Sequence, residues 1–442
     1  MAVTGGLRAS LGTTGISITS SLRLLVGAAV VAAIRHAFHR RPSLLDVLWT
    51  LRLRRLSDAW SVTGLIWAVS RASVIVAGYF AVLLFELPHP PQFRVSDNSF
   101  LNLPARWDAG WYLDIAVNGY RWHGVPYKQQ NIAFFPAFPM AMRAAGALLG
   151  GWRPGIRPVE RAPLVLYGGW LVALAAFWYA LVYLYRWALV RAGPAVATAT
   201  VTLLAAYPFA VFYSAPYTEG VYLLAAVAVF YHFEREEWWR AAGWGVLIGL
   251  VRPNGALIAI PLAMLAVRQL FRQQPRRVLS AAWVAVGAPA AALCAHALFI
   301  RALTGRFFAW SDAQAAWGRS YQLTTWVGLE MTRVAETGIL RYPAEAPVTI
   351  LNGLALMMTV LLLWIVTRAI GLAYLMFIVV NLVPAVLSGG LLSVGRFTST
   401  LFPLFFSLAL VIPPRHLNAC VLGFSVLQGL FAALFFTWRP PF

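Results

Sequence analysis

Charged residues are scarce in this chain. Only 11% of its 442 residues are Asp, Glu, Lys or Arg, whereas 60% are hydrophobic. A soluble globular domain carries about 25% charged residues, and a disordered chain carries few hydrophobic ones. The composition excludes both classes. Apolar stretches of about 20 residues recur along the chain, and each is long enough to cross a hydrocarbon core of about 30 Å. These stretches predict an all-α polytopic membrane protein.

Acidic residues, lysines and cysteines are also few. The chain has 15 acidic residues against 35 Lys and Arg, which gives a net charge of +20, and Lys128 is the only lysine. The arginines lie in short loops between apolar stretches, as the positive-inside rule requires. The charge therefore indicates membrane topology, and we expect no nucleic-acid partner. Cys294 and Cys420 lie in separate apolar segments, so no disulfide framework is expected.

Several sequence motifs of cofactor binding are absent. There is no Walker A motif, no dinucleotide-binding glycine pattern and no cluster of metal ligands. No Asp-X-Asp pair is present to hold a metal and a nucleotide diphosphate. We therefore expect no cofactor and no sugar-nucleotide donor, and the sequence leaves dependence on a divalent metal open.

Two domains are expected. Residues 1–58 contain a short apolar stretch, 24–34, followed by a basic run, and they predict a cytoplasmic or interfacial N-terminal extension. Residues 59–442 predict the transmembrane domain. Eleven spans are expected in it: 62–86, 163–190, 194–212, 217–233, 238–251, 254–267, 279–303, 347–367, 369–389, 396–413 and 417–437.

The segment 131–150 decides the topology. If it spans the membrane, the basic loop 268–277 lies outside, against the positive-inside rule. Pro136 and Pro139 near its start favour a bent helix that returns to the same surface. We therefore expect a cytoplasmic N-terminus and two long extracytoplasmic loops, 87–162 and 304–346. The turns at 214–219, 252–255 and 393–396 are then expected on the same, extracytoplasmic side of the membrane as these two loops.

Asp108 is the strongest candidate for a catalytic residue. It lies between an arginine and a run of aromatics in the first long loop, in the segment Arg-Trp-Asp-Ala-Gly-Trp-Tyr. As a structural residue it would cap a helix that begins near Ala109. As a functional residue it would be a general base, because apolar rings can raise the basicity of a carboxylate. Asp114 falls on another helix face and is expected to be solvated.

The remaining candidates are polar and aromatic residues of the later loops. Glu219 suits either a helix start or a contact with substrate. Arginines at the membrane edge are costly in lipid and suit a phosphate, which they can bind with two hydrogen bonds. Arg396 could equally anchor its helix to lipid headgroups. The expected substrate-binding residues are Arg106, Trp107, Trp111, Tyr112, Tyr217, Glu219, Arg252, Asn254, Gln314, Trp317, Arg319 and Arg396.

Three segments resemble one known family. Arg106-Trp107-Asp108-Ala109 with Gly119-Tyr120, and the run from Asn131 to Pro139, closely resemble the PIG-V family, GPI mannosyltransferase II, and its bacterial relatives. The segments 214–219 and 252–255 look like two further motifs of the family, in the same order. The resemblance covers roughly residues 60–410. The sequence departs from the family at Gly110-Trp111-Tyr112, where eukaryotic members tend to have a different triplet. This difference bears on acceptor specificity more than on catalysis.

This resemblance implies a GT-C glycosyltransferase fold with juxtamembrane helices and a catalytic acid in the first outer loop. It implies an inverting mannosyltransferase of the plasma membrane with an extracytoplasmic active site. The donor would be polyprenyl-phosphate mannose and the acceptor a lipid or glycan. Polyprenyl-phosphate arabinose or glucose remains an alternative donor. A lipid or sugar transporter or flippase is the alternative of another class, although it would predict repeat symmetry, which the sequence lacks.

Overall fold

The computed structural model describes residues 7–11, 14–18, 59–125, 128–270, 276–319 and 323–440. The chain divides into two units, residues 1–62 and residues 63–442. In the first unit, β1 (Leu7–Leu11) and β2 (Thr14–Ile18) pair as an antiparallel hairpin, a feature that the sequence did not predict. The predicted interfacial stretch 24–34 and the basic run after it lie outside the described residues.

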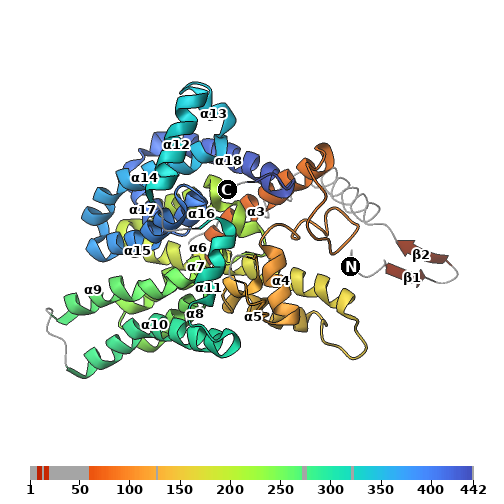
Figure 1. Cartoon of the computed structure of the whole chain (residues 1–442), viewed down its shortest axis with the longest axis horizontal. Coiled ribbons are helices and arrows are strands. Elements are labelled where there is room, and N and C mark those ends of the chain that lie inside the picture. Colours follow the sequence, from red (N-terminus) through yellow and green to blue (C-terminus); the bar gives the residue numbers. More distant parts are fainter. Residues whose placement is uncertain are drawn as a thin grey trace. The chain divides into compact units, whose positions relative to one another are not determined.

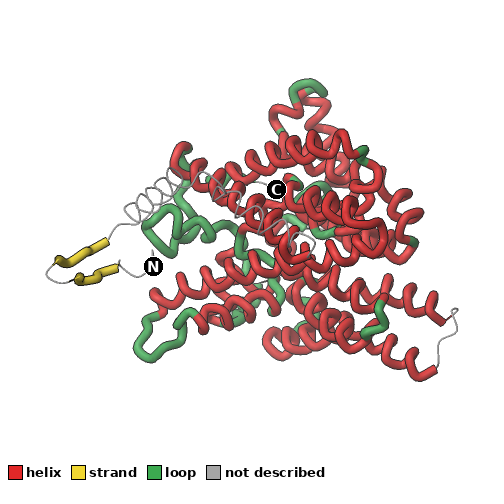
Figure 2. Tube along the Cα trace, turned by 180° about the vertical axis from the view of Figure 1, so that it is seen from behind, coloured by secondary structure: helices red, strands yellow, loops and turns green. Residues whose placement is uncertain are grey.

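Helices make up most of the described chain (Figure 2). Six of them are long and apolar enough to cross a membrane, and they coincide with six of the predicted spans. This part of the prediction, a polytopic helical membrane protein, is confirmed. The six are α3 (Ala59–Leu84), α6 (Pro158–Ala206), α10 (Arg276–Thr304), α14 (Pro347–Ile370), α15 (Leu372–Gly389) and α18 (Pro414–Phe436) (Figure 1).

Shorter elements occupy the other predicted spans. The predicted spans 163–190 and 194–212 join in α6, which breaks at Gly193 (φ 79°) before Pro194. A helix of 16 residues is about 24 Å long, so none of the short helices equals the hydrocarbon thickness alone. The number of eleven spans therefore stays a prediction. The elements are η2 (Pro208–Ser214), α7 (Glu219–Glu234), α8 (Trp238–Val251), η3 (Pro253–Ile258), α9 (Ala259–Leu270), α16 (Val394–Ser399) and α17 (Phe402–Val411).

The segment 131–150 forms two short helices. These are η1 (Asn131–Ala133) and α5 (Ala137–Leu148), with Pro136 just before α5. Because α5 has 12 residues, it is about 18 Å long and cannot cross a core of about 30 Å by itself. This length agrees with a helix that returns to the surface from which it came.

The first long loop also carries α4 (Ala109–Asn118). Between α10 and α14, the second long loop forms a series of short helices. They are α11 (Ala309–Asp312), η4 (Ala313–Trp317), α12 (Leu323–Thr337) and α13 (Tyr342–Glu345).

Close packing around the start of α7 positions the residues that follow. A Cβ on Gly220 would lie 2.8 Å from the carbonyl oxygen of Ala173, so the glycine lets α7 approach α6 closely. In α3, the buried Arg71 donates hydrogen bonds to Ala205, Ala210 and the hydroxyl of Ser214. It thereby satisfies carbonyl groups where α6 ends and η2 turns. The turn that leads to Glu219 is held from two sides.

Candidate active site

Asp108 precedes the first residue of α4, but its side chain does not cap that helix. Its Oδ2 atom instead accepts a hydrogen bond of 2.9 Å from Nη1 of Arg396. The side chain is 20% exposed. Trp107 before it has φ 48°, a left-handed conformation that costs a bulky residue free energy. A strained backbone at Trp107 thus accompanies an Asp108 carboxylate that points toward Arg396. Helix capping does not explain this orientation.

Glu219 joins two arginines behind Asp108. It is fully buried, and its Oε1 atom accepts hydrogen bonds from Nη2 of Arg252 and from Nε of Arg396. Its Oε2 atom is buried and has no hydrogen-bond partner within the described ranges. Two acids and two arginines thus form a charge-balanced cluster, which we call the acid–arginine cluster: Asp108, Glu219, Arg252 and Arg396.

Each arginine of this cluster retains one uncommitted nitrogen. Among the described residues, Nη2 of Arg396 and Nη1 of Arg252 make no hydrogen bond, whereas the other guanidinium nitrogens donate to Glu219, Asp108 and Thr218. Their side chains are 12% and 11% exposed. Both groups are fixed by buried partners, so these N–H donors are held in place before any anion arrives.

Tyrosine rings form one wall of the cluster. The guanidinium of Arg396 lies 4.7 Å from the ring centre of Tyr217, whose hydroxyl accepts the backbone N–H of Asp108 at 3.0 Å. Tyr112 is buried, and its hydroxyl lies 3.4 Å from Oγ1 of Thr218. Burial raises the pKa of Tyr112 to about 12. This hydroxyl therefore stays protonated at neutral pH and remains a hydrogen-bond donor.

The second long loop reaches the same place through Arg319. Its guanidinium lies 5.2 Å from the ring centre of Phe397, and Arg252 lies 5.8 Å from that ring. Phe397 follows Arg396 directly, so one ring separates Arg319 from the cluster. Nη1 of Arg319 lies 3.5 Å from the hydroxyl of Ser388. The structure therefore brings Arg319 beside the predicted site.

Aromatic residues join the two long loops to each other. Trp111 packs against Phe134 and Trp317, with ring centres 6.0 and 5.6 Å away. Gln314 donates to the carbonyl oxygen of Ala133 at 2.9 Å. Trp111, Trp317 and Gln314 thus lie together near α4, and Gln314 is engaged with backbone.

Three predicted substrate-binding residues are engaged elsewhere. Arg106 is 2% exposed, and its guanidinium donates to the carbonyl oxygens of Asn102, Ala105 and Phe436. Trp107 donates its indole N–H to Phe435 at 3.0 Å. These two residues fasten the loop to the end of α18. Asn254 donates to the side chain of Asn381 at 2.9 Å, on α15.

Asp114 is not the solvated residue expected from the sequence. Its two oxygens accept hydrogen bonds from Arg121, Asn118 and Asn131. This carboxylate fastens the loop 119–131 onto α4. The sequence could not show this, because the partners lie up to 17 residues away across a loop.

Other residues of the site escaped the sequence analysis. Phe397 and Asn352 carry no recognisable motif, yet Oδ1 of Asn352 accepts the backbone N–H of Gly395 at 2.7 Å. A Cβ on Gly395 would lie 2.1 Å from the ring of the buried Phe209. Together these contacts fix the start of α16, which carries Arg396. Throughout the described part of the chain, no group of three His, Cys, Asp or Glu side chains could hold a metal ion.

Part of the chain matches a protein family. Residues 81–286 match the family described as Mannosyltransferase (PIG-V). The resemblance to PIG-V seen in the sequence is confirmed over this segment, and the match supports a membrane-bound glycosyltransferase of the mannosyltransferase type. No curated protein matches the chain.

The PIG-V match covers part of the acid–arginine cluster. Asp108, Glu219 and Arg252 lie inside residues 81–286, whereas Arg396 and Arg319 lie beyond them. Ion pairs and ring contacts connect these two arginines to the matched part. The site is therefore built from both the matched and the unmatched portions of the chain.

Proposed function

We propose that the protein is an inverting mannosyltransferase that uses polyprenyl-phosphate mannose at the outer face of the plasma membrane. The acceptor is a lipid or glycan hydroxyl. The observation that carries the proposal is the ion pair of Asp108 with Arg396 beside the buried pair of Glu219 and Arg252. The PIG-V match supports mannose as the sugar.

In this mechanism Asp108 is the general base. Its carboxylate takes the proton of the acceptor hydroxyl as that oxygen attacks the anomeric carbon of mannose. The bond between this carbon and the phosphate oxygen breaks, and polyprenyl phosphate leaves with the bonding electrons. A single displacement from the opposite side inverts the anomeric configuration.

Arg396 and Arg252 bind the donor phosphate. Their uncommitted Nη atoms can donate to phosphate oxygens, and negative charge on the leaving group increases as the bond breaks. Because Nη1 of Arg396 holds Asp108, a phosphate that attracts this guanidinium competes with the carboxylate for it. Donor binding thus loosens Asp108 for proton transfer. Glu219 is a positioning residue, since it orients both guanidinium groups.

The outer-face orientation rests on charge and length. The positive-inside rule places Arg186, Arg191 and Arg268 on the cytoplasmic side. Glu219 and Glu234 are the first and last residues of α7. The acid–arginine cluster, at the Glu219 end, then faces outward.

Direct assay tests this proposal. The purified protein is incubated with polyprenyl-phosphate mannose and a membrane lipid extract, and the product is identified by mass spectrometry and NMR. We expect a mannosylated product with inverted anomeric configuration. Polyprenyl-phosphate arabinose and glucose serve as matched donors. Transfer from either of them but not from the mannose donor would contradict the choice of sugar, and a retained configuration would contradict the mechanism.

A further inference from the structure

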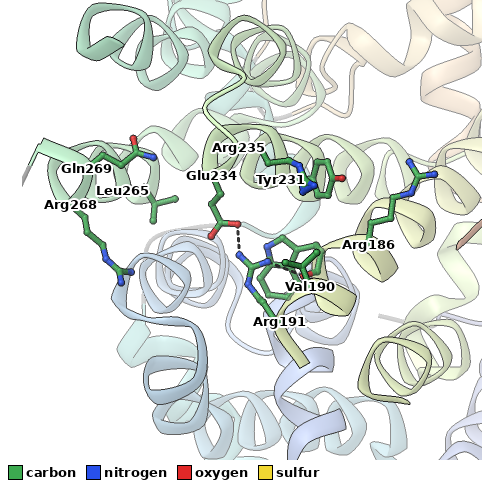
Figure 3. A pocket seen from close by; sticks show the side chains of 10 residues that line it. Arg186, Val190, Arg191, Tyr231, Glu234, Arg235, Leu265, Arg268 and Gln269 are labelled. Atoms are coloured by element: carbon green, nitrogen blue, oxygen red, sulfur yellow. Dashed lines mark hydrogen bonds and ion pairs between the residues drawn. The ribbon is translucent and has the colours of Figure 1, made fainter. Parts of the chain in front are cut away.

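The other end of α7 carries a second group of charged residues. Glu219 begins this helix and Glu234 ends it, so the two acids are about 22 Å apart along the axis. A pocket of about 410 Å³ opens beside Glu234, between the part of α6 just before its break at Gly193 and the last turns of α7 and α9 (Figure 3). Four arginines and a single glutamate line it: Arg186, Arg191, Arg235, Arg268 and Glu234.

Arg191 is the fixed centre of this basic pocket. It forms an ion pair with Glu234, donates to the carbonyl oxygen of Trp187 at 2.9 Å, and stacks on the Trp187 ring with its guanidinium 3.9 Å from the ring centre. The other oxygen of Glu234 accepts the hydroxyl of Tyr374 at 2.7 Å. Both oxygens of the single acid in the pocket are therefore engaged, and Glu234 makes no ion pair with Arg235 or Arg268.

Arg235 and Arg268 supply the excess charge. Arg235 lies over the Tyr231 ring at 4.4 Å, an arrangement that leaves its N–H groups free to donate at the edge of the guanidinium. Within the described ranges neither arginine has an ion-pair partner among the acidic residues. Both are exposed. Arginines in this arrangement suit an anion that offers several hydrogen-bond acceptors, such as a phosphate group.

The walls of the pocket suggest what carries that anion. Val190 and Leu265 belong to its lining, and Val190 is 73% exposed on the apolar helix α6. An anionic head with an apolar tail fits a basic cavity that continues onto an apolar helix surface. We propose that this pocket binds a phosphate group, carried by a membrane lipid headgroup or as free phosphate. It is a site distinct from the acid–arginine cluster.

Positive charge at the cytoplasmic ends of helices also arises from membrane topology alone. That explanation needs no particular arginine, since any exposed cation on this side serves equally. The basic pocket requires Arg235 and Arg268 specifically. Arg240 provides the matched control: it lies in the first turn of α8, near the same end of α7, is exposed, and pairs with Glu237 at 3.0 Å outside the pocket.

The experiment measures binding of phosphatidylglycerol to the purified full-length protein in nonionic detergent, with phosphatidylcholine as the neutral lipid. Arg235→Gln, Arg268→Gln, their double variant and Arg240→Gln are compared with the wild type. We expect saturable binding of phosphatidylglycerol, weakened about tenfold or more in the double variant and unchanged in Arg240→Gln. Circular dichroism and gel filtration verify that each variant is folded.

Two further arms define the site and the ligand. Arg396→Ala, which removes a proposed phosphate-binding group of the acid–arginine cluster, should bind phosphatidylglycerol as the wild type does. Inorganic phosphate that displaces the lipid at millimolar concentration would make free phosphate a ligand of the same pocket, whereas absence of competition would restrict the pocket to the lipid. The proposal is overturned if neither phosphatidylglycerol nor phosphate binds saturably, if Arg240→Gln weakens binding as much as the pocket variants, or if Arg396→Ala abolishes binding.

Discussion

Nη1 of Arg396 donates to Oδ2 of Asp108 at 2.9 Å, although the two residues are 288 positions apart in the chain. The pair joins the first long loop to the short helix α16. It also connects the part of the chain that matches PIG-V to a part that does not. Asp108, the proposed base, is therefore in direct contact with Arg396, the arginine proposed to bind the phosphate, and substitutions can separate their roles.

Asp108→Asn removes the charge but nearly keeps the shape. Asparagine cannot take the acceptor proton, so we expect turnover to fall by about 10²–10⁴-fold with the protein still folded in detergent. Initial rates with saturating donor and acceptor measure this. Asp97→Asn is the matched control, because Asp97 lies exposed in the same loop. Turnover close to that of the wild type in Asp108→Asn would remove Asp108 from the catalytic role.

Arg396→Lys keeps the charge and removes the planar fork. Arg396 uses Nε for Glu219 and Nη1 for Asp108, and one ammonium group cannot reproduce both contacts and still serve a phosphate. We expect the apparent donor affinity to fall about tenfold or more, and Arg396→Ala to lose more. The measurement is donor KM and kcat at saturating acceptor. Arg94→Lys, in the exposed part of the first loop, is the control. If both Arg396 variants behave like the wild type, Arg396 is only a lipid anchor.

Glu219→Gln removes the buried charge that two arginines share. Breaking a buried ion pair by removing one partner costs about 3–5 kcal/mol of the free energy of unfolding. We therefore expect a clear fall in the thermal unfolding midpoint as well as in turnover. Glu160→Gln, at the exposed start of α6, is the control and should change the midpoint little. An unchanged midpoint in Glu219→Gln would show that the cluster does not stabilise the fold.

Cysteine labelling tests the orientation. Cys294 and Cys420 are first replaced by serine, and single cysteines are introduced at Gln129, in the first long loop, and at Trp239, in the first turn of α8. Both positions are exposed. In intact cells an impermeant maleimide should label the cysteine at 129 and leave that at 239 unmodified until the cells are opened. The reverse pattern would place the acid–arginine cluster on the cytoplasmic side.

Length and apolarity were enough to predict the long helices. The predicted span 347–367 corresponds to α14, and 417–437 corresponds to α18, each within a few residues. Such helices can be recognised from local composition. In lipid, every backbone N–H and C=O group of a spanning segment must be hydrogen-bonded within the protein, and a long apolar helix meets this requirement by itself. The short helices α7 and α8 were predicted equally well, since the expected spans 217–233 and 238–251 end within two residues of theirs. The division of the expected span 396–413 into α16 and α17 was not predicted.

The candidate site was predictable as a set of segments but not as a set of contacts. The aromatic surroundings of Asp108 and the arginine after the turn at 393–395 could be recognised from the sequence. Arg106 looked equally suitable, yet carbonyl oxygens of α18 and its own loop use its donors. Its pKa is lowered by burial to about 10, so it keeps its charge at neutral pH as a structural group. Only long-range packing distinguishes such an arginine from one that faces a substrate.

Arg71 makes the same point from the opposite direction. It lies within the first predicted span, where a charge is expensive in lipid and suggests function. Its donors instead hold the end of α6 and the turn of η2. A charge in an apolar helix thus has a structural use when neighbouring helices break and expose carbonyl groups.

The sharing of one carboxylate oxygen of Glu219 by Arg252 and Arg396 also restricts how the sequence can change. Loss of the acid alone leaves two neighbouring cations without their shared counter-ion. Loss of either arginine alone leaves Glu219 with one ion-pair partner in place of two. The effects of substitutions at these positions are therefore non-additive, and replacing Glu219 together with Arg252 should cost less than the two single changes added. We therefore expect these three positions to change together during evolution and not one at a time.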